Sequence, residues 1–497
     1  MNLIKVENEV KLTIAEDETN PLLQGHFTSV GKEYTATSES LQVIGEIPKD
    51  LKGIYVRNGH NQVHAPMGVY HPFDGDGMLH AVHFEDGKAT YRNRFVRTTG
   101  FLAEEAAGKS LWAGILEPHL NTRQGWGSMR TMKDNAGTDV IAHAGKLLAT
   151  MSQCSEVNRL DPITLEMLEP DAWNKTVAPN GICSHYKVDN DTGEMMFFNF
   201  SETYPYMHYG VVGPDSELKH YVPIDLPGVR WPHDLGVTKN YSILHDLPFI
   251  FDPELLEKGE RKVTFYDDMP ARFGIIPRLG TSEDIKWFEA KPCFIYHLSN
   301  SYESGDSVIM EGCVTFNPKK PVVGKQGEDA IANVQKNFDA SIIKYKMYRW
   351  TFNLKTGQTK EEFLDDEVTE FPVVSNDYVG KEYRYSYNSV LSLDKPWWLS
   401  GLKKYDLKEG TSQTYDYGEG RLGSEPHIAR RENAVGEDDG YLITLITDMN
   451  EDRSECLILD AKDLTMGPVA RIILPHRIPA GAHAAWVESD RIKGELL

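Results

Sequence analysis

Short extended stretches separated by Gly-, Asn- or Asp-containing turns recur from one end of the chain to the other. In the clearest case, AVHF and ATYRNRFV flank the turn EDGK (residues 81–96). Apolar, aromatic and β-branched residues on both sides of such a turn are typical of an antiparallel hairpin. The same pattern predicts four more hairpins, at residues 185–200, 293–313, 348–364 and 404–417. The chain is therefore predicted to be mostly β.

Helical periodicity is scarce. We expect helices only at 101–116 (FLAEEAAGKSLWAGIL) and 327–338 (GEDAIANVQKNF), on top of a β core. A chain with so many strands has many sheet edges, and radial repetition of four-stranded sheets around an axis protects them. Neither a fixed-period repeat nor a long Pro-, Gly- or Ser-rich linker divides the chain. We therefore predict an all-β fold, a single-domain seven-bladed β-propeller over residues 1–497 in which residues 1–24 form an N-terminal extension.

Composition and charge narrow the functional class. The 497 residues are 40% hydrophobic and 25% charged, as in a packed globular protein, and the net charge of −22 disfavours nucleic acid as a partner. No secretory signal or membrane-spanning run is expected, since the N-terminus carries early acids and no 18-residue window is apolar. The five cysteines are widely spread without a CxxC pair. Reduced thiols in a cytoplasmic protein are the expectation.

Four of the 17 histidines stand out by their context. Each is placed at or inside an apolar extended segment, where an unpaired imidazole would be costly. They are His185 (ICSHYKV), His233 (RWPHDLG), His297 (CFIYHLS) and His483 (AGAHAAWV). The wide gaps between them exclude a local HxxxH or HExxH motif. If they meet, they meet in space, as residues of inner strands around a propeller axis could.

Imidazole ligands suit iron, copper, zinc and nickel. Four histidines without a cysteine or carboxylate would be unusual for catalytic zinc, which normally has three protein ligands and a water. Four nitrogens on an octahedral ion leave two positions open, enough for dioxygen beside a substrate. Ligating imidazoles normally donate their other N–H to an acceptor, often a carboxylate. Glu370 in TEFPVV and Glu425 in GSEPHIA, each beside a Pro-containing apolar run, are candidates, and exposed loop acids are the alternative.

Several long motifs, in order, resemble the carotenoid cleavage oxygenase family. They are NPLLQGHFTSV, LQVIGEIPKDLKGIYVRNGHNQV, YHPFDGDGMLHAVHFEDGKATYRNRFVRT, the four histidine segments, EFP at Glu370, SEP at Glu425, EDDGYLITLITD and AHAAWV. The resemblance covers essentially the whole chain. It implies a seven-bladed propeller whose axis holds one Fe(2+) per chain on His185, His233, His297 and His483, under a helical and loop cap that encloses a hydrophobic tunnel.

The resemblance also implies the reaction, in which iron and O2 cleave a carbon–carbon double bond of a conjugated chain into two carbonyl products. Gln153, Glu370 and Glu425 match the acceptors for the ligand imidazoles. Thr138 aligns with a small hydroxyl residue beside the open iron position. Phe101, Ile115 and Ser152 are assigned to the substrate cleft.

Three departures from the family pattern matter. The family's third glutamate falls on Gln153, which can still accept a hydrogen bond but is neutral, so its expected partner His233 should be a less basic ligand. The RNGPNP element reads Arg57 to Gln62 as RNGHNQ, without either proline. Around the first ligand, Ser184-His185-Tyr186-Lys187 replaces Ala-His-Pro-Lys, and the histidine is retained.

Two substrate classes compete. Stilbene and phenylpropanoid cleavers of the family anchor a phenol with a Tyr and a Lys, which align with Ile115 and Ser152 in this chain. Because a phenol oxygen in a dry tunnel needs a partner, we expect a carotenoid or apocarotenoid, with stilbenes and phenylpropanoids as the alternative. A non-cleaving isomerase or carotenoid binder is a further alternative. Carotenoids dissolve in membranes, so peripheral membrane contact through an apolar rim at 242–259 is possible, with ordinary core as the other interpretation.

Overall fold

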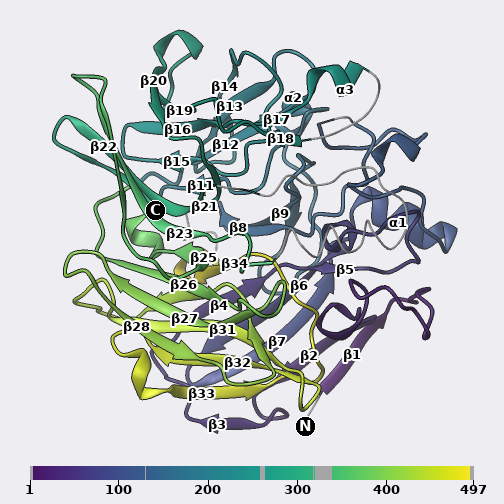
Figure 1. Ribbon diagram of the computed structural model, residues 1–497. Helices are drawn as coiled ribbons and strands as arrows, with labels where there is room; N and C mark the ends of the chain where they lie inside the picture. The colour runs from purple at the N-terminus through teal and green to yellow at the C-terminus, as the bar shows by residue number, and fades with distance from the viewer. Residues whose placement is uncertain (1–3, 129, 258–262, 317, 319–338, 493–497) are drawn as a thin grey trace.

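Antiparallel sheets arranged around an axis form the body of the molecule (Figure 1). The computed structural model describes residues 4–128, 130–257, 263–316, 318 and 339–492. Within these residues there are seven sheets of three or more strands and one two-stranded ribbon, which confirms the predicted mostly-β propeller. The five predicted hairpins are all present as adjacent antiparallel strands.

Strands that neighbour one another in a sheet are hydrogen-bonded, and the sheets follow the chain around the axis. In pairing order, the first sheet contains β1 (Ile4–Glu9), β2 (Lys32–Thr37), β7 (Lys88–Phe95), β6 (Asp76–Glu85), β4 (Gly53–Arg57) and β34 (Ala484–Glu488), with β5 (His60–Asn61) paired to β6. The second contains β10 (Asn158–Leu160), β9 (Lys146–Thr150) and β8 (Asp139–His143). The third contains β11 (Lys187–Val188), β12 (Met195–Phe200), β13 (Met207–Val212) and β14 (Leu218–Ile224). The next two contain β15 (Gly236–Val237), β16 (Tyr241–Asp246), β19 (Ala271–Pro277) and β20 (Lys286–Ala290); and β21 (Phe294–Ser304), β22 (Ser307–Thr315), β23 (Lys346–Asn353) and β24 (Thr359–Phe363).

The last two sheets contain β25 (Thr369–Val373), β26 (Tyr385–Leu391), β27 (Leu399–Asp406) and β28 (Thr411–Asp416); and β29 (Arg421–Gly423), β31 (Gly440–Asp448), β32 (Arg453–Asp460), β33 (Pro468–Ile473) and β3 (Val43–Gly45), with β30 (His427–Arg430) paired to β31. The ribbon consists of β17 (Phe249–Phe251) and β18 (Val263–Phe265).

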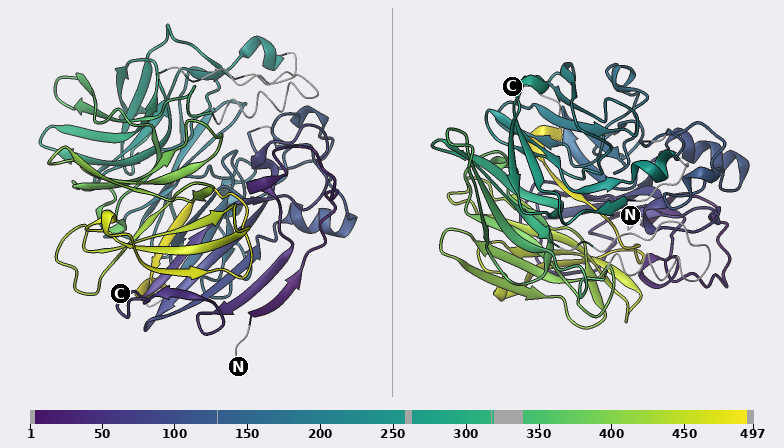
Figure 2. Two further views of the ribbon diagram at one scale, coloured as in Figure 1. Left: turned by 60° about the horizontal axis from the view of Figure 1, so that its bottom comes forward. Right: turned by 45° about the horizontal axis from the view of Figure 1, so that its top comes forward.

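The ring of sheets is closed by both ends of the chain. The C-terminal strand β34 pairs with β4 in the first sheet, and the N-terminal strand β3 pairs with β33 in the last. Yellow C-terminal and purple N-terminal strands accordingly lie side by side in both views of Figure 2. The N-terminal extension is attached to the first sheet, because its strand β1 pairs with β2. The two ends of the chain therefore each supply a strand to the blade at the opposite end of the sequence.

Neighbouring sheets contact one another through a small set of inner strands. Contacts between sheets join β34 to β8, β15 to β21, β21 to β25 and β30 to β34. Their side chains are mostly buried on both faces, as expected for strands covered by other blades. The four expected metal ligands lie on, or just before, strands of this inner ring or of β11.

The predicted helix at 101–116 is confirmed only in its first half. Helix α1 spans Thr99–Ala107, and the Thr98 side chain caps its start by accepting the Phe101 N–H. It ends at Gly108, whose φ of 64° is left-handed and stops helix propagation. Residues 109–116 are not helical. The second predicted helix, 327–338, lies outside the described residues.

The interpretation of 242–259 as a membrane-facing rim is wrong for its first part. Ile243, Leu244, Leu247, Phe249 and Phe251 are all buried in one hydrophobic cluster. They lie on or between β16 and β17, whose neighbouring strands cover them. Among the described residues, no helix combines the length and the apolarity that a membrane crossing requires.

Three further short helices in the described part of the chain are α2 (Asn174–Val177), α3 (Pro253–Glu257) and α5 (Ser489–Ile492).

Candidate metal centre

The propeller topology brings the four expected histidines close together. His185 lies two residues before β11, His233 three residues before β15, and His483 directly before β34. His297 lies within β21. Because each comes from a different sheet, no local sequence spacing could have joined them.

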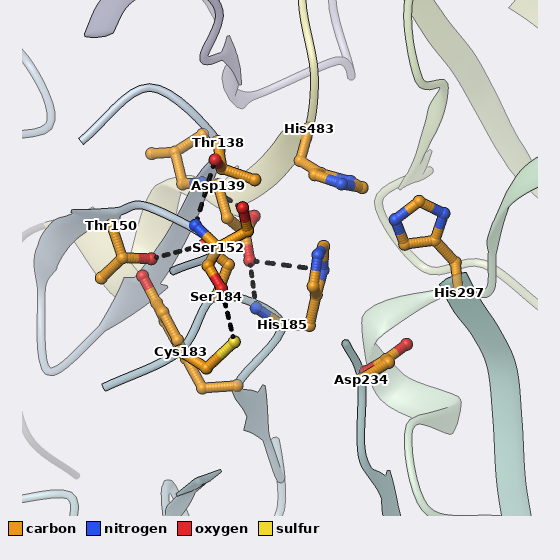
Figure 3. Close-up of polar contacts among 12 residues, drawn as sticks. Thr138, Asp139, Thr150, Ser152, Cys183, Ser184, His185, Asp234, His297 and His483 are labelled. Atoms are coloured by element: carbon orange, nitrogen blue, oxygen red, sulfur yellow. Dashed lines mark hydrogen bonds and ion pairs between the residues drawn. The ribbon is translucent and has the colours of Figure 1, made fainter. Parts of the chain in front are cut away.

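Three of these rings converge closely enough to hold one ion. Ligand atoms of His185, His297 and His483 all lie within 4.8 Å of one another. Their ring centroids are 4.5 to 4.9 Å apart. Figure 3 shows the three imidazoles facing one another across the axis. His233 is adjacent, with its centroid 4.6 Å from that of His185 and 5.2 Å from that of His297, but it does not belong to the converging triad.

The available nitrogens fit a metal. His185 Nε2 and His297 Nε2 are buried and have no hydrogen-bond partner in the described protein. Burial holds the pKa of His185, His233 and His297 well below the usual value, and like-charged neighbouring histidines lower it further. Neutral imidazole with a free lone pair is the form that binds a transition metal. A buried, unpaired nitrogen would otherwise be costly.

Two buried glutamates orient two of these rings. His297 Nδ1 is 2.5 Å from Glu370 Oε2, and His483 Nδ1 is 3.1 Å from Glu425 Oε1. Each contact occupies Nδ1 and leaves Nε2 for a ligand, the arrangement common in metal proteins. Each glutamate is further fixed by a backbone N–H, from Phe371 for Glu370 and from Ala484 for Glu425.

The two histidine–glutamate pairs differ in the direction of their pKa shifts. Burial raises the pKa of Glu370 well above its usual value, against the smaller lowering effect of the Phe371 N–H. At Glu425, burial is outweighed by the charges and hydrogen bonds of His483 and His427, which lower the pKa. Burial also opposes protonation of His483, but Glu425 raises its pKa overall. The shifts at His483 and Glu425 are thus opposite in direction to those at His297 and Glu370.

His233 is held differently. Gln153 is buried, yet within the described structure neither its amide nor any other side chain hydrogen-bonds to the His233 ring. The ring instead packs edge-on against Tyr296, with centroids 4.7 Å apart. Thr138 does lie at the centre. Its carbonyl accepts the His483 N–H, and its Oγ1 accepts the Ser152 N–H (Figure 3).

Two aspartates at the centre were not predicted from the sequence. Asp139 Oδ2 accepts the His185 backbone N–H at 3.0 Å and lies 3.9 Å from the ring Nδ1 (Figure 3). Asp234, beside His233, is almost completely buried. The sequence offered only adjacency as a signal, since each aspartate directly follows a residue already singled out.

Two residues at the centre have strained backbone conformations. His185 and Phe371 have φ values of 68° and 52°, in the left-handed region that non-glycine residues rarely adopt. Such a conformation costs about 1–3 kcal/mol and persists where surrounding contacts impose it. At this centre it points the His185 ring at the axis and stacks the Phe371 ring on His297, with centroids 5.0 Å apart.

An apolar cavity of about 80 Å³ adjoins one side of the rings. Aromatic and aliphatic side chains dominate its described wall, together with Thr138, His233, His297 and His483. The wall includes Phe73, Tyr296, Ile343, Tyr345, Phe371, Leu391, Trp397, Trp398 and Leu399. At its edge, Lys395 Nζ lies 4.2 Å from the centroid of the Trp398 ring.

A second cavity, of about 170 Å³, contacts the same histidines, and its lining is more polar than that of the first cavity. It contacts His185, His297 and His483, but its other lining residues include Asp139, Lys187 and Asp234. The histidine cluster therefore borders two cavities whose linings differ in polarity.

The residues assigned to the substrate cleft do not line the described apolar cavity. Phe101 packs on Phe95 in a separate core cluster under α1. The Ile115 N–H is bonded to Asp74, and the Ser152 carbonyl accepts the Cys183 thiol. Their place in the cleft stays a prediction, while the aromatic wall was not found from the sequence because its residues are scattered through the chain.

Comparison with known proteins agrees with this geometry. The chain matches the family "Retinal pigment epithelial membrane protein" over residues 27–488. Carotenoid 9,10(9',10')-cleavage dioxygenase 1 of Arabidopsis thaliana is 33% identical, over 100% of this chain and 95% of the relative. A lignostilbene dioxygenase of Pseudomonas brassicacearum superposes with a TM-score of 0.82 at 26% identity, over 96% of this chain and 100% of that one.

The cobalt-substituted Synechocystis apocarotenoid oxygenase superposes with a TM-score of 0.80 at 26% identity, over 93% of this chain and 98% of that one. Matches of this extent, in both sequence and structure, establish kinship. The chain belongs to the retinal pigment epithelial membrane protein family, which is the family of the carotenoid cleavage oxygenases.

Proposed function

We propose that this chain is a non-haem iron(II) dioxygenase that cleaves a carbon–carbon double bond of a carotenoid or apocarotenoid. One Fe(2+) would be held by His185, His233, His297 and His483. Both atoms of O2 are consumed, one entering each of the two carbonyl products, so the reaction balances without a further reductant. Iron, when bound, supplies the binding and activation of dioxygen.

One observation carries the proposal: ligand nitrogens of three imidazoles converge beside a cavity whose wall is largely aromatic, and two of these nitrogens are buried without a hydrogen-bond partner in the described protein. Imidazole ligands without cysteine suit a redox metal, and an apolar wall suits a conjugated hydrocarbon. The chain's own part is to orient the rings through Glu370 and Glu425 and to exclude water from the reacting bond.

Aromatic side chains lead from the cavity to the ligands. The Phe73 ring contacts Trp397, and Trp397 contacts Phe371, with centroids 5.3 and 6.1 Å apart. Phe371 in turn packs on His297 and His483. A polyene lying against this wall would present a double bond to the open side of the metal. The carotenoid class is further supported by the Arabidopsis thaliana relative, named for carotenoid cleavage.

A second candidate is cleavage of a stilbene or phenylpropanoid. Polar residues of the cavity lining favour it, namely Tyr296, Tyr345 and Lys395. A phenol could be anchored there although Ile115 and Ser152 offer no anchor. The structural match to a lignostilbene dioxygenase points the same way.

The test is an aerobic assay of the iron-loaded protein under ¹⁸O2. The substrates are β-apo-carotenals of several lengths, β-carotene, resveratrol and isoeugenol, with the metal-free protein as control. Labelled aldehydes from the polyenes, with little turnover of resveratrol and isoeugenol, are expected. Hydroxybenzaldehydes from resveratrol with intact polyenes would establish the second candidate instead. Bound or isomerised polyene without labelled product would identify a binder or an isomerase and overturn the proposal.

A further inference from the structure

The carboxylate of Asp234 links the three chain segments that carry His185, His233 and His297. Its Oδ2 accepts the Leu298 N–H at 2.8 Å, and its Oδ1 accepts the N–H of its neighbour Leu235 at 2.7 Å. The Oδ1 atom also lies 2.8 Å from Lys187 Nζ. Figure 3 shows Asp234 on the far side of His185 from Asp139.

Each partner lies next to a different histidine. Leu298 follows His297 on β21, and Lys187 begins β11, two residues after His185. Asp234 itself follows His233. These strands belong to three separate sheets, so no ladder of backbone hydrogen bonds fixes one relative to another. The carboxylate supplies direct links among all three.

Burial makes this arrangement expensive unless every interaction is made. Asp234 is 1% exposed, and a carboxylate buried at such a position is strongly destabilising unless it is paired and hydrogen-bonded. The Lys187 ammonium and two backbone N–H groups compensate it with charge-assisted hydrogen bonds, which are short and directional. A displacement of any of the three strands would break one of them.

The link is most needed at His233. The rings of His297 and His483 are oriented by glutamates, whereas within the described residues the His233 ring has no such acceptor. Its position therefore depends on its backbone, and the residue that anchors that backbone to the other ligand strands is Asp234.

We propose that Asp234 is a positioning residue that sets the placement of His233 relative to His185 and His297, and with it the affinity and geometry of the bound metal. The inference rests on the proposed metal function. It assigns Asp234 no contact with metal or substrate.

The test compares Asp234→Ala and Asp234→Asn with the wild-type protein by titration with Co(II). Cobalt is chosen because its visible absorption reports ligand number and geometry, and a cobalt-substituted relative has been solved. Asp234→Ala should weaken Co(II) binding by about 10- to 100-fold, the usual effect of losing an outer partner of a metal site, and change the spectrum. Asp234→Asn keeps an oxygen for the Leu298 N–H and should show a smaller loss.

Asp246→Asn is the matched control. Asp246 is a similarly buried aspartate of the same blade, on β16, but its carboxylate is bonded to Arg230 and Arg272 instead of to ligand strands. We expect this variant to unfold at a lower temperature with an unchanged cobalt spectrum and affinity. A purely structural role of Asp234 would give the same result as this control.

The outcomes separate the two proposals. Wild-type protein that binds neither Fe(II) nor Co(II) would overturn the proposed function and this inference together. Wild-type protein that binds metal, with an Asp234→Ala variant of unchanged affinity and spectrum, would overturn this inference alone. If Asp234→Ala does not fold, Asp234→Asn decides, since a spectrum identical to wild type would exclude a positioning role.

Discussion

His297 and His483 each direct Nδ1 to a buried glutamate, whereas His233 contacts Tyr296 edge-on and, among the described residues, finds no ring acceptor. The first two rings cannot rotate without losing a buried hydrogen bond. The third is fixed by packing and by the backbone on either side of it. Nitrogens of the well-anchored rings and of His185 converge within 4.8 Å, and His233 stands just outside that group.

This difference indicates how a centre built from separate blades is assembled. A hydrogen bond to the imidazole ring fixes the direction of the ligand lone pair. A hydrogen bond to the backbone fixes only the position of the main chain and leaves the ring orientation free. His185 illustrates the second case, since Asp139 binds its N–H and lies too far from its ring, at 3.9 Å, for a hydrogen bond. We therefore expect unequal contributions from the four histidines.

The largest effect should come from the triad. His297→Ala or His483→Ala removes a converging nitrogen and leaves a buried glutamate without its partner, so we expect loss of stoichiometric metal and of activity. Metal analysis of the purified variants measures this. His143→Ala is the matched control, because His143 is buried and bonded to the Gly193 carbonyl outside the centre. Iron content near wild type in either triad variant would remove that residue from the ligand set.

His233→Ala should have the next largest effect. The triad remains, so the variant should still bind metal, but more weakly than wild type because one nitrogen is lost. Titration with Fe(II) under anaerobic conditions would give the two affinities. A loss as complete as in the triad variants would show that all four histidines contribute equally, and no loss would exclude His233 as a ligand.

The third largest effect is expected from replacing the glutamates that accept hydrogen bonds from the ligand rings. Glu370→Ala and Glu425→Ala remove the acceptor for His297 and His483, and should each cost about 10- to 100-fold in metal affinity or activity. The corresponding Gln variants keep a carbonyl acceptor and should lose less. Affinities measured in parallel with protein stability separate ligand orientation from folding. Alanine variants with wild-type metal affinity would contradict the orienting role.

Much of this arrangement was accessible from the sequence. Hairpin patterns predicted the β architecture, and the four histidines were marked by their place in apolar extended segments. The aromatic wall was not accessible, because Phe73, Tyr296 and Trp397 come from distant loops and strands that only the closed ring brings together. Asp139 and Asp234 were missed because each binds a backbone N–H of another blade, and Asp234 also pairs with Lys187 of another blade, contacts that only the closed ring brings about.

The helix at 101–116 shows a different limit. Its apolar and charged residues continue beyond Ala107, but Gly108 adopts a left-handed conformation and ends the helix there. The apolar residues of 242–251 show a similar limit. Their pattern is the same for an apolar surface rim and for ordinary core. Only the neighbouring strands decide between them, and they bury the stretch.

The smallest effect should come from Gln153→Glu. The resemblance aligns Gln153 with a glutamate and predicts that it faces His233, so a carboxylate there is expected to supply the ring acceptor that the described structure lacks. We expect a folded, active protein whose metal affinity equals or exceeds that of wild type, because an ionised acceptor makes an imidazole a more basic ligand. Gln153→Ala serves as the control and should change affinity little, since Gln153 makes no hydrogen bond to His233 in the described structure. The two variants are compared by Co(II) titration and thermal unfolding. A misfolded or metal-free Gln153→Glu protein would show that this buried position faces something other than His233, whereas a large loss in Gln153→Ala would show that the amide already orients the ring.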